Sequence, residues 1–273
     1  MRSVFIVGAA GFVGRALART AARYDAIRTF SLAHSELDLE RPETWFHIEG
    51  GADCLVHAAG RLDGNRQQLF AANADHAADL ADCLNAKSVR RLIYLSTGAV
   101  YGAVSGITTP ATECRPESDY AQSKRAAERA FRDVYKGELR ILRLYYPYGP
   151  GQAKPRLMPR LLDAVLREEV ILCNRDGGPW LNIGHVDDLA GIILNDFILP
   201  KENGPAVVNL ASDRIMSIAE IAGAMARHVG KPVRLAETGT QPSAPSVPYA
   251  PGRWRAFAVA DIDPPQTGSL VSR

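Results

Sequence analysis

Residues 3–14 read Ser-Val-Phe-Ile-Val-Gly-Ala-Ala-Gly-Phe-Val-Gly, and this segment is the strongest indication of the fold class. The apolar run at 3–7 predicts a buried strand, and residues 12–23 predict a helix. Gly8, Gly11 and Gly14 lie at the turn between them, where glycine lets the backbone approach a pyrophosphate at the helix N-terminus. The placement predicts a dinucleotide-binding turn, and a glycine-rich turn without a ligand is the alternative.

Short apolar runs and longer amphipathic runs keep alternating beyond this turn. The pattern predicts, in order, a strand at 27–32, a strand at 53–57, a helix at 65–85, a strand at 91–96, a helix at 119–135 and a strand at 139–144. Such alternation favours an α/β fold with a doubly wound parallel sheet of the Rossmann type.

The composition of the sequence changes after residue 145, where a loop rich in Pro, Gly and Tyr begins. Ser217 followed by Glu220 fits a capping box that opens a helix through residue 229. The other elements expected here are a helix at 156–168, a strand at 170–173, a helix at 185–199, a strand at 206–211 and a tail rich in Pro, Ser and Gly at 238–255.

Composition excludes several classes of function. Hydrophobic residues make up 47% and charged residues 23%, as in an ordinary globular protein. The net charge of +2 is too small to indicate a nucleic-acid partner or an acidic membrane surface, and no segment is apolar over a bilayer's length. The four cysteines are Cys54, Cys83, Cys114 and Cys173, and their spacing is not that of metal ligands. We therefore expect no metal and a reducing, cytoplasmic setting.

Further motifs follow the glycine turn in a fixed order. They are residues 57–60 (His-Ala-Ala-Gly), 96–102 (Ser-Thr-Gly-Ala-Val-Tyr-Gly), 120–124 (Tyr-Ala-Gln-Ser-Lys), 143–151, 185–188 (His-Val-Asp-Asp) and 208–210 (Val-Asn-Leu). Together they resemble the extended short-chain dehydrogenase/reductase family, the NAD-dependent epimerase/dehydratase group, over roughly residues 1–230.

Tyr120 and Lys124 are four residues apart, which places them one turn apart on one face of a helix. A free tyrosine has a pKa of about 10, and a nearby ammonium with a positive nicotinamide ring favours its phenolate. Tyr120 is then able to remove a hydroxyl proton while hydride leaves the same carbon, with Thr97 bonding the same oxygen. The alternative is an ordinary surface pair.

The resemblance implies two sets of binding residues. Expected cofactor contacts are Gly8, Gly11, Phe12, Val13, Gly14, Ser31, Asp38, Leu39, Ala58, Ala59, Gly60, Asn73, Ser96, Tyr120, Lys124 and Tyr146. Expected substrate contacts are Thr97, Gly98, Ala99, Pro147, Tyr148, Trp180 and Arg253. It also implies an NAD(P)-binding domain at 1–150 and 185–213 and a small substrate-binding lobe at 151–184 and 214–273.

The sequence departs from the family pattern at two places. Gly98 and Ala99 stand where the family's dehydratases carry an acidic pair, so dehydration is disfavoured. Leu181 stands where many members have an arginine that contacts diphosphate. Arg253 and Arg255 are candidate replacements for that arginine, and the alternative is that both are solvated residues of the tail. Trp180 is a candidate to stack on a base or sugar, and the alternative is that it only packs in the protein interior.

Cofactor choice depends on the end of the second strand. NAD-selective sites carry an Asp or Glu about twenty residues past the glycines. Here residues 30–34 (Phe-Ser-Leu-Ala-His) hold no acid, and Glu36 and Asp38 come later. Ser31 or His34 is able to hydrogen-bond a 2′-phosphate. The sequence therefore predicts that NADP(H) is accepted at least as well as NAD(H), with a slight tilt to NADP(H).

The function expected from these motifs is oxidation, reduction or epimerisation at a sugar carbinol or ketone carbon of a nucleotide-activated sugar. Residues 34–40 (HSELDLE) resemble the keto-deoxysugar reductase branch and support an NADPH-dependent ketoreductase of such a nucleotide or of another small carbonyl. A non-catalytic dinucleotide sensor is a third interpretation, which the presence of Tyr120 and Lys124 opposes. The resemblance also implies a homodimer that pairs through helices 65–85 and 119–135.

Overall fold

A six-stranded parallel sheet forms the centre of the molecule, with strand order β10-β5-β4-β3-β1-β2. The computed structural model describes residues 1–104, 107–154, 156–200, 204–238 and 259–262. The strands are β1 (Arg2–Val7), β2 (Ile27–Leu32), β3 (Cys54–His57), β4 (Arg91–Thr97), β5 (Glu138–Leu144) and β10 (Val207–Leu210). The predicted doubly wound α/β fold is confirmed.

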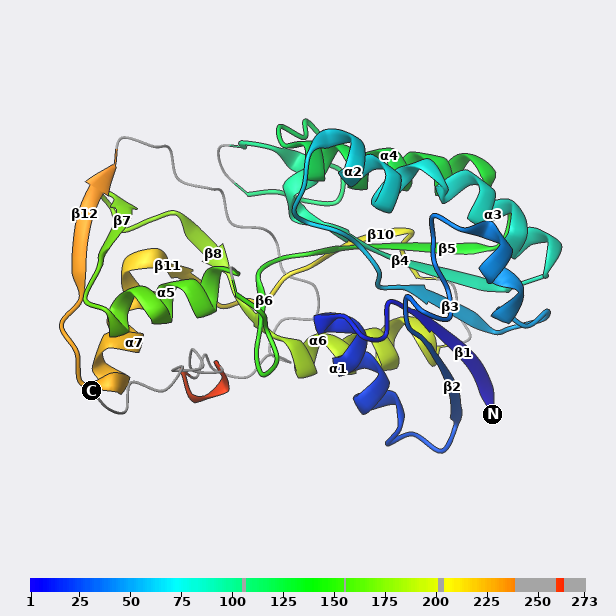
Figure 1. Cartoon of the computed structure of the whole chain (residues 1–273), viewed down its shortest axis with the longest axis horizontal. Coiled ribbons are helices and arrows are strands. Elements are labelled where there is room, and N and C mark those ends of the chain that lie inside the picture. The colour runs from blue at the N-terminus through cyan, green and yellow to red at the C-terminus, as the bar shows by residue number, and fades with distance from the viewer. Residues whose placement is uncertain (105–106, 155, 201–203, 239–258, 263–273) are drawn as a thin grey trace, which may run out of the picture.

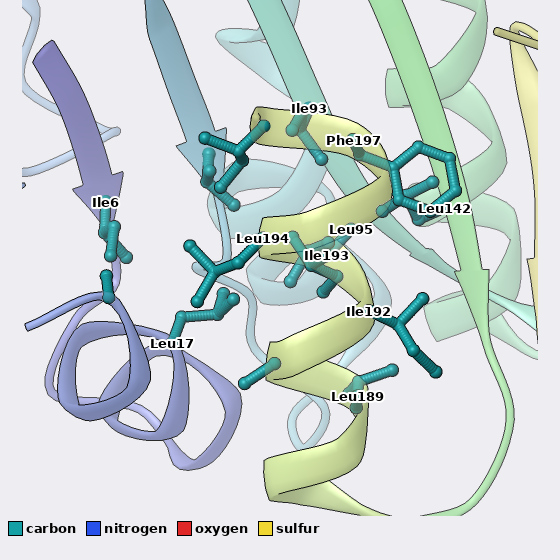
Figure 2. Close-up of a cluster of buried hydrophobic side chains, with 14 of the residues drawn as sticks. Ile6, Leu17, Ile93, Leu95, Leu142, Leu189, Ile192, Ile193, Leu194 and Phe197 are labelled. Atoms are coloured by element: carbon teal, nitrogen blue, oxygen red, sulfur yellow. The ribbon is translucent and has the colours of Figure 1, made fainter. Parts of the chain in front are cut away.

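Helices cover both faces of this sheet (Figure 1). Strands β1, β3 and β4 are buried over most of their length, as apolar strands between two helical layers should be. Figure 2 shows one layer, in which side chains of α1 (Phe12–Ala21), of α6 (Val186–Ile192) and of the residues just after α6 lie against Ile6, Ile93 and Leu142. The opposite layer holds α3 (Ala77–Ala86) and α4 (Asp119–Val134).

The strand order reverses at β1, which has β2 on one side and β3 on the other. In open α/β sheets, ligands bind outside the carboxyl ends of the strands at such a reversal. The turn between β1 and α1 and the loop after β3 both start from this edge. The topology therefore places the glycine turn and residues 58–60 side by side.

Two helices differ from their predicted form. The expected helix at 65–85 is divided into α2 (Arg66–Phe70), the π-helical segment η2 (Ala71–Asp75) and α3. The expected helix at 185–199 is α6 followed by the π-helical segment η4 (Ile193–Ile198). A widened turn shifts the apolar spacing by only one residue, so periodicity does not reveal it. The capping box of Ser217 and Glu220 is confirmed at the start of α7 (Ile218–Val229).

A third buried cluster lies outside the sheet, in the part drawn at the left of Figure 1. Helices α5 (Leu157–Leu166) and α7 pack there through Leu161, Ile221 and Met225. Short strand pairs complete this part and its junction with the sheet, and most are too brief for a periodic signal: β7 (Val170–Asn174) with β12 (Arg234–Thr238), β8 (Trp180–Asn182) with β11 (Ile215–Ser217), and β6 (Pro147–Tyr148) with β9 (Gly184–His185).

Three short 3₁₀ segments complete the described chain: η1 (Pro42–His47), η3 (Gly98–Tyr101) and η5 (Val259–Asp261). No helix within the described ranges has both the length and the apolar character needed to cross a membrane.

Candidate active site

A cavity of about 570 Å³ lies where the carboxyl ends of the central strands meet the third cluster. Its walls come from the start of α1, the loop after β3, the end of β4 with η3, the start of α4, the segment after β5, and the start of α5 with β8. The lining residues are Gly11, Phe12, Val13, Ala58, Ala59, Gly60, Leu62, Leu95, Ser96, Thr97, Gly98, Ala99, Tyr101, Gly102, Val104, Thr108, Tyr120, Lys124, Leu144, Tyr145, Tyr146, Pro147, Gln152, Arg156, Leu157, Met158, Trp180 and Asn182.

The glycine turn at one end of the cavity is packed too closely for side chains. A Cβ at Gly14 would overlap the carbonyl oxygen of Gly8, and a Cβ at Gly8, whose φ is +83°, would lie 2.5 Å from the amide nitrogen of Ala59. The first turn of α1 has no side-chain cap and no acidic residue. Its free N–H groups are therefore suited to an anion, and the turn fits the pyrophosphate of a dinucleotide.

Thr97, Tyr120 and Lys124 all line the same cavity. Thr97 is the last residue of β4, and Tyr120 is the second residue of α4, which Ser118 caps by accepting a hydrogen bond from Ala121 N at 3.2 Å. The Thr97 hydroxyl lies close enough to Tyr120 to lower the pKa of that tyrosine. The order strand, loop, helix thus brings together two hydroxyl groups that are far apart in sequence.

Burial dominates the acid–base properties of this group. It raises the pKa of Tyr120, while the positive charge of Arg156 and the hydrogen bond with Thr97 act in the opposite direction. Burial also lowers the pKa of Lys124 to about 7, against the charge of Glu128. The Lys124 Nζ lies 4.2 Å from the centroid of the Tyr94 ring. Arg156, which sequence reasoning did not single out, therefore adds a cationic effect on Tyr120.

A buried network of ion pairs and hydrogen bonds lies next to the end of β4. Both oxygens of the fully buried Glu128 carboxylate accept hydrogen bonds: Oε1 from Arg143 Nε at 2.9 Å and Oε2 from Arg143 Nη2 at 2.7 Å. Ser96 Oγ donates to Oε1 at 2.6 Å, and Arg125 Nη1 donates to Oε2 at 2.6 Å. Because Ser96 precedes Thr97, this network fixes the end of β4.

Many of the sequence-predicted residues come together in the cavity, and others do not. Those in the lining are Gly11, Phe12, Val13, Ala58, Ala59, Gly60, Ser96, Thr97, Gly98, Ala99, Tyr120, Lys124, Tyr146, Pro147 and Trp180. Gly8 and Gly14 lie just behind it in the packed turn. Ser31, Asp38 and Leu39 lie outside the lining, in the region that follows the middle of β2. Arg253 is outside the described residues.

Asn73 and Tyr148 are buried away from the cavity lining. The Asn73 side chain accepts from Arg61 N and donates to Arg61 O, both at 2.8 Å, and it donates to Ser123 Oγ at 3.0 Å. It therefore holds the loop after β3 against α4. Tyr148 is 1% exposed and packs edge-on against His185, with ring centroids 5.4 Å apart. The structure does not bring Tyr148 to the expected substrate border.

Sequence reasoning missed several lining residues, of which Tyr145 and Arg156 matter most. A Cβ at Gly98 would lie 2.5 Å from Tyr145 Cζ, so the tyrosine ring occupies the space beside Gly98. Tyr145 falls inside the quoted 143–151 motif, which offered a signal for it. Arg156 follows that motif, and no pattern marked it.

The end of β2 also differs from what the sequence suggested. Glu36 folds back, and its Oε2 accepts a hydrogen bond from Ala33 N at 2.9 Å. The turn thus brings a carboxylate to the end of a strand that has no acid of its own. Asp38 is engaged elsewhere, since its Oδ1 accepts from Glu40 N at 3.0 Å and its Oδ2 lies 3.6 Å from His34 Nε2.

Comparison with known proteins finds one family profile, described as the NAD dependent epimerase/dehydratase family, that matches residues 4–211. A dTDP-4-dehydro-6-deoxy-D-allose reductase from a Streptomyces species is 25% identical over 96% of this chain and 92% of its own length. The dTDP-glucose 4,6-dehydratase of Streptomyces griseus is 26% identical over 67% of this chain and 58% of its own.

Solved structures share the fold. The UDP-glucuronic acid 4-epimerase from Bacillus cereus, in complex with UDP-glucuronic acid and NAD, superposes with a TM-score of 0.76 over 95% of this chain and 96% of that one. The sequences are 19% identical, so this likeness supports the Rossmann-type architecture.

Proposed function

The chain belongs to the NAD-dependent epimerase/dehydratase family and is an enzyme of the extended short-chain dehydrogenase type. We propose that it oxidises or reduces a carbinol or ketone carbon of a nucleotide-activated sugar. One observation carries the proposal. A single cavity joins the uncapped end of α1 to the hydroxyls of Thr97 and Tyr120 and the amine of Lys124. Segments 151–184 and 214–273 would form the substrate-binding lobe over this cavity.

The dinucleotide, when bound, supplies the hydride acceptor or donor. The glycine turn and the N-terminus of α1 would hold its pyrophosphate, and residues 58–60 would support it beside Lys124. Tyr120 Oη takes the proton of the substrate hydroxyl in oxidation and returns it in reduction, while Thr97 bonds the same oxygen and orients it. Burial raises the pKa of Tyr120, which stabilises the protonated phenol that acts as the acid in reduction.

Dehydration is disfavoured by the shape of the site. Elimination of water needs an acid or base beside the reacting sugar carbons, and the family's acidic pair is replaced here by Gly98 and Ala99. The ring of Tyr145 fills the space next to Gly98. Oxidation, reduction, or epimerisation through a transient ketone fits the residues that remain.

A ketoreductase is the second candidate, favoured by the likeness to a dTDP-keto-sugar reductase across 96% of this chain. Mass spectrometry of small molecules released from the purified protein distinguishes an epimerase from a ketoreductase. Tightly retained NAD supports an epimerase, which regenerates its cofactor at each turnover, whereas an empty site that takes up NADPH supports a reductase. A protein that binds neither dinucleotide would contradict both.

Cofactor choice depends on the carboxylate of Glu36. The sequence favours NADP(H), but Glu36 Oε2 accepts a hydrogen bond from Ala33 N just past the end of β2. This position supports a role for the Glu36 carboxylate in binding the ribose hydroxyls and repelling a 2′-phosphate. We therefore expect NAD(H) to bind at least about tenfold more tightly than NADP(H), and Glu36→Gln to narrow that gap. Calorimetric titration of both cofactors decides it, with Glu40→Gln as control. Equal or tighter NADP(H) binding by the unsubstituted protein would restore the tilt to NADP(H).

A homodimer is the expected assembly. Helices α3 and α4 lie side by side on one face of the sheet (Figure 1), and Asn85 Nδ2 donates to Val134 O across them at 2.9 Å. The exposed residues of α3 and α4 include both acidic and basic side chains, namely Asp79, Asp82, Arg129, Arg132 and Asp133. A two-fold interface is able to pair these opposite charges. Light scattering at micromolar concentration should give twice the chain mass, and a monomer would count against the dimer.

A further inference from the structure

The cavity is positively charged. Of its lining residues in the described part of the chain, only Lys124 and Arg156 carry charged side chains, and none carries a carboxylate. Lys124 is buried beside Tyr94 and has Glu128 one turn along the helix. Arg156 therefore remains as the cation whose counter-ion the lining does not supply.

Arg156 immediately precedes α5, at the edge where the third cluster meets the sheet, and it is half-buried. Within the described ranges its guanidinium has no ion pair or hydrogen bond, whereas Arg125 and Arg143 both bind Glu128. A guanidinium that loses water without gaining an acceptor is costly. A cation in this position is suited to binding an anionic group of a ligand that enters the cavity.

The position of Arg156 relative to the reacting atoms restricts what that anion is. Arg156 shares the cavity wall with Thr97 and Tyr120, and its charge opposes the effect of burial on the pKa of Tyr120. An anion bound there lies near the carbon whose oxygen contacts the Tyr120 hydroxyl. A diphosphate is attached at the anomeric carbon, which lies across the ring from a reacting carbinol at C4. A carboxylate on the carbon next to the reacting carbinol lies directly beside it.

We propose that Arg156 binds a substrate carboxylate carried next to the reacting carbinol, so that the substrate class is a nucleotide-activated uronic acid. This inference rests on the proposed function. A guanidinium offers two parallel N–H donors that match a carboxylate, and such charge-assisted pairs are stronger than neutral hydrogen bonds. The pair orients the sugar ring so that its carbinol faces Tyr120 and Thr97.

The test compares Arg156→Gln, Arg156→Lys and the control Arg160→Gln with the unsubstituted protein. Arg160 is exposed on the same helix and lies outside the cavity lining. Calorimetry on NADH-saturated protein measures the binding of UDP-glucuronic acid, UDP-glucose and UDP alone. We expect Arg156→Gln to weaken UDP-glucuronic acid binding by about tenfold to a hundredfold and to leave UDP-glucose and UDP within about twofold. Arg156→Lys should lie between, and Arg160→Gln should match the unsubstituted protein.

The outcomes separate this inference from the proposed function. If Arg156→Gln weakens the binding of all three ligands equally, Arg156 binds the diphosphate and the inference is overturned. Unchanged binding of UDP-glucuronic acid by Arg156→Gln also overturns it. NADH affinity within about twofold of normal shows that each variant is folded. If the unsubstituted protein binds NADH but neither the UDP ligands nor their dTDP counterparts, the nucleotide-sugar proposal fails. Free D-glucuronate and D-glucose then decide the role of Arg156: tighter glucuronate binding that Arg156→Gln abolishes supports it, and equal binding overturns it.

Discussion

Replacing Tyr120 with phenylalanine should lower turnover by at least about a hundredfold while the affinity for the dinucleotide is unchanged. The substitution removes the Oη that exchanges a proton with the substrate, and it leaves the ring and the glycine turn in place. Thr97, still at the end of β4, is able to bind the substrate oxygen but does not replace the missing acid. Steady-state kinetics on the true substrate and calorimetry with the dinucleotide provide the two measurements.

Tyr24→Phe is the matched control, because it removes a phenol whose hydrogen bonds run to Asn195, outside the cavity lining. Its turnover should equal that of the unsubstituted protein. Near-normal turnover of purified Tyr120→Phe would instead remove Tyr120 from the proton-transfer role, and a parallel loss of dinucleotide binding would point to a structural role.

Glu128→Gln is expected to reduce the free energy of unfolding by about 3–5 kcal/mol, the range for removing one partner of a buried ion pair. Glu128 is 0% exposed and Arg143 is 1% exposed, so the guanidinium is left buried without its counter-charge. Removing both charges together, as Glu128→Leu with Arg143→Met, should recover much of the loss. Urea denaturation measures each variant. A single-variant loss below about 1 kcal/mol would show that the pair is weakly coupled to folding.

The same pair should make the protein sensitive to acid. Burial alone would raise the pKa of Glu128, but hydrogen bonds and charge from Arg143 bring that pKa below its ordinary value. A carboxyl group whose pKa is lower in the folded than in the unfolded chain stabilises the fold above its unfolded pKa, about 4.3, and loses this contribution as the pH falls through its folded value. The stability difference from Glu128→Gln should therefore shrink with falling pH below about 4.

Local chemistry made the central part of the fold predictable. The spacing of Gly8, Gly11 and Gly14 is imposed by close backbone contacts, so the sequence shows it directly. The capping box of Ser217 and Glu220 depends on residues three apart, and it too is visible in the sequence. Strand and helix order followed from apolar periodicity because the central strands are covered on both faces.

What the sequence did not show depends on contacts between distant segments. Arg156 joins the cavity only because α5 packs against α7, and a lone arginine after a Pro/Gly-rich loop carries no pattern of its own. Glu36 reaches the end of β2 through a turn whose backbone could not be derived from residue types. Tyr148 belongs to a motif that resembles a substrate-binding segment, yet the packing of His185 turns it inward.

The contact between Tyr145 and Gly98 constrains the order in which this enzyme could acquire a new reaction. A carboxylate at position 98 would collide with a ring that is held in place by a 3.1 Å hydrogen bond between Tyr145 Oη and Thr108 Oγ1. A single substitution at Gly98 is therefore disruptive, whereas the same substitution after Tyr145 has been replaced by a smaller residue finds room. A mutational path to a dehydratase that places an acid at position 98 therefore needs a smaller residue at position 145 first.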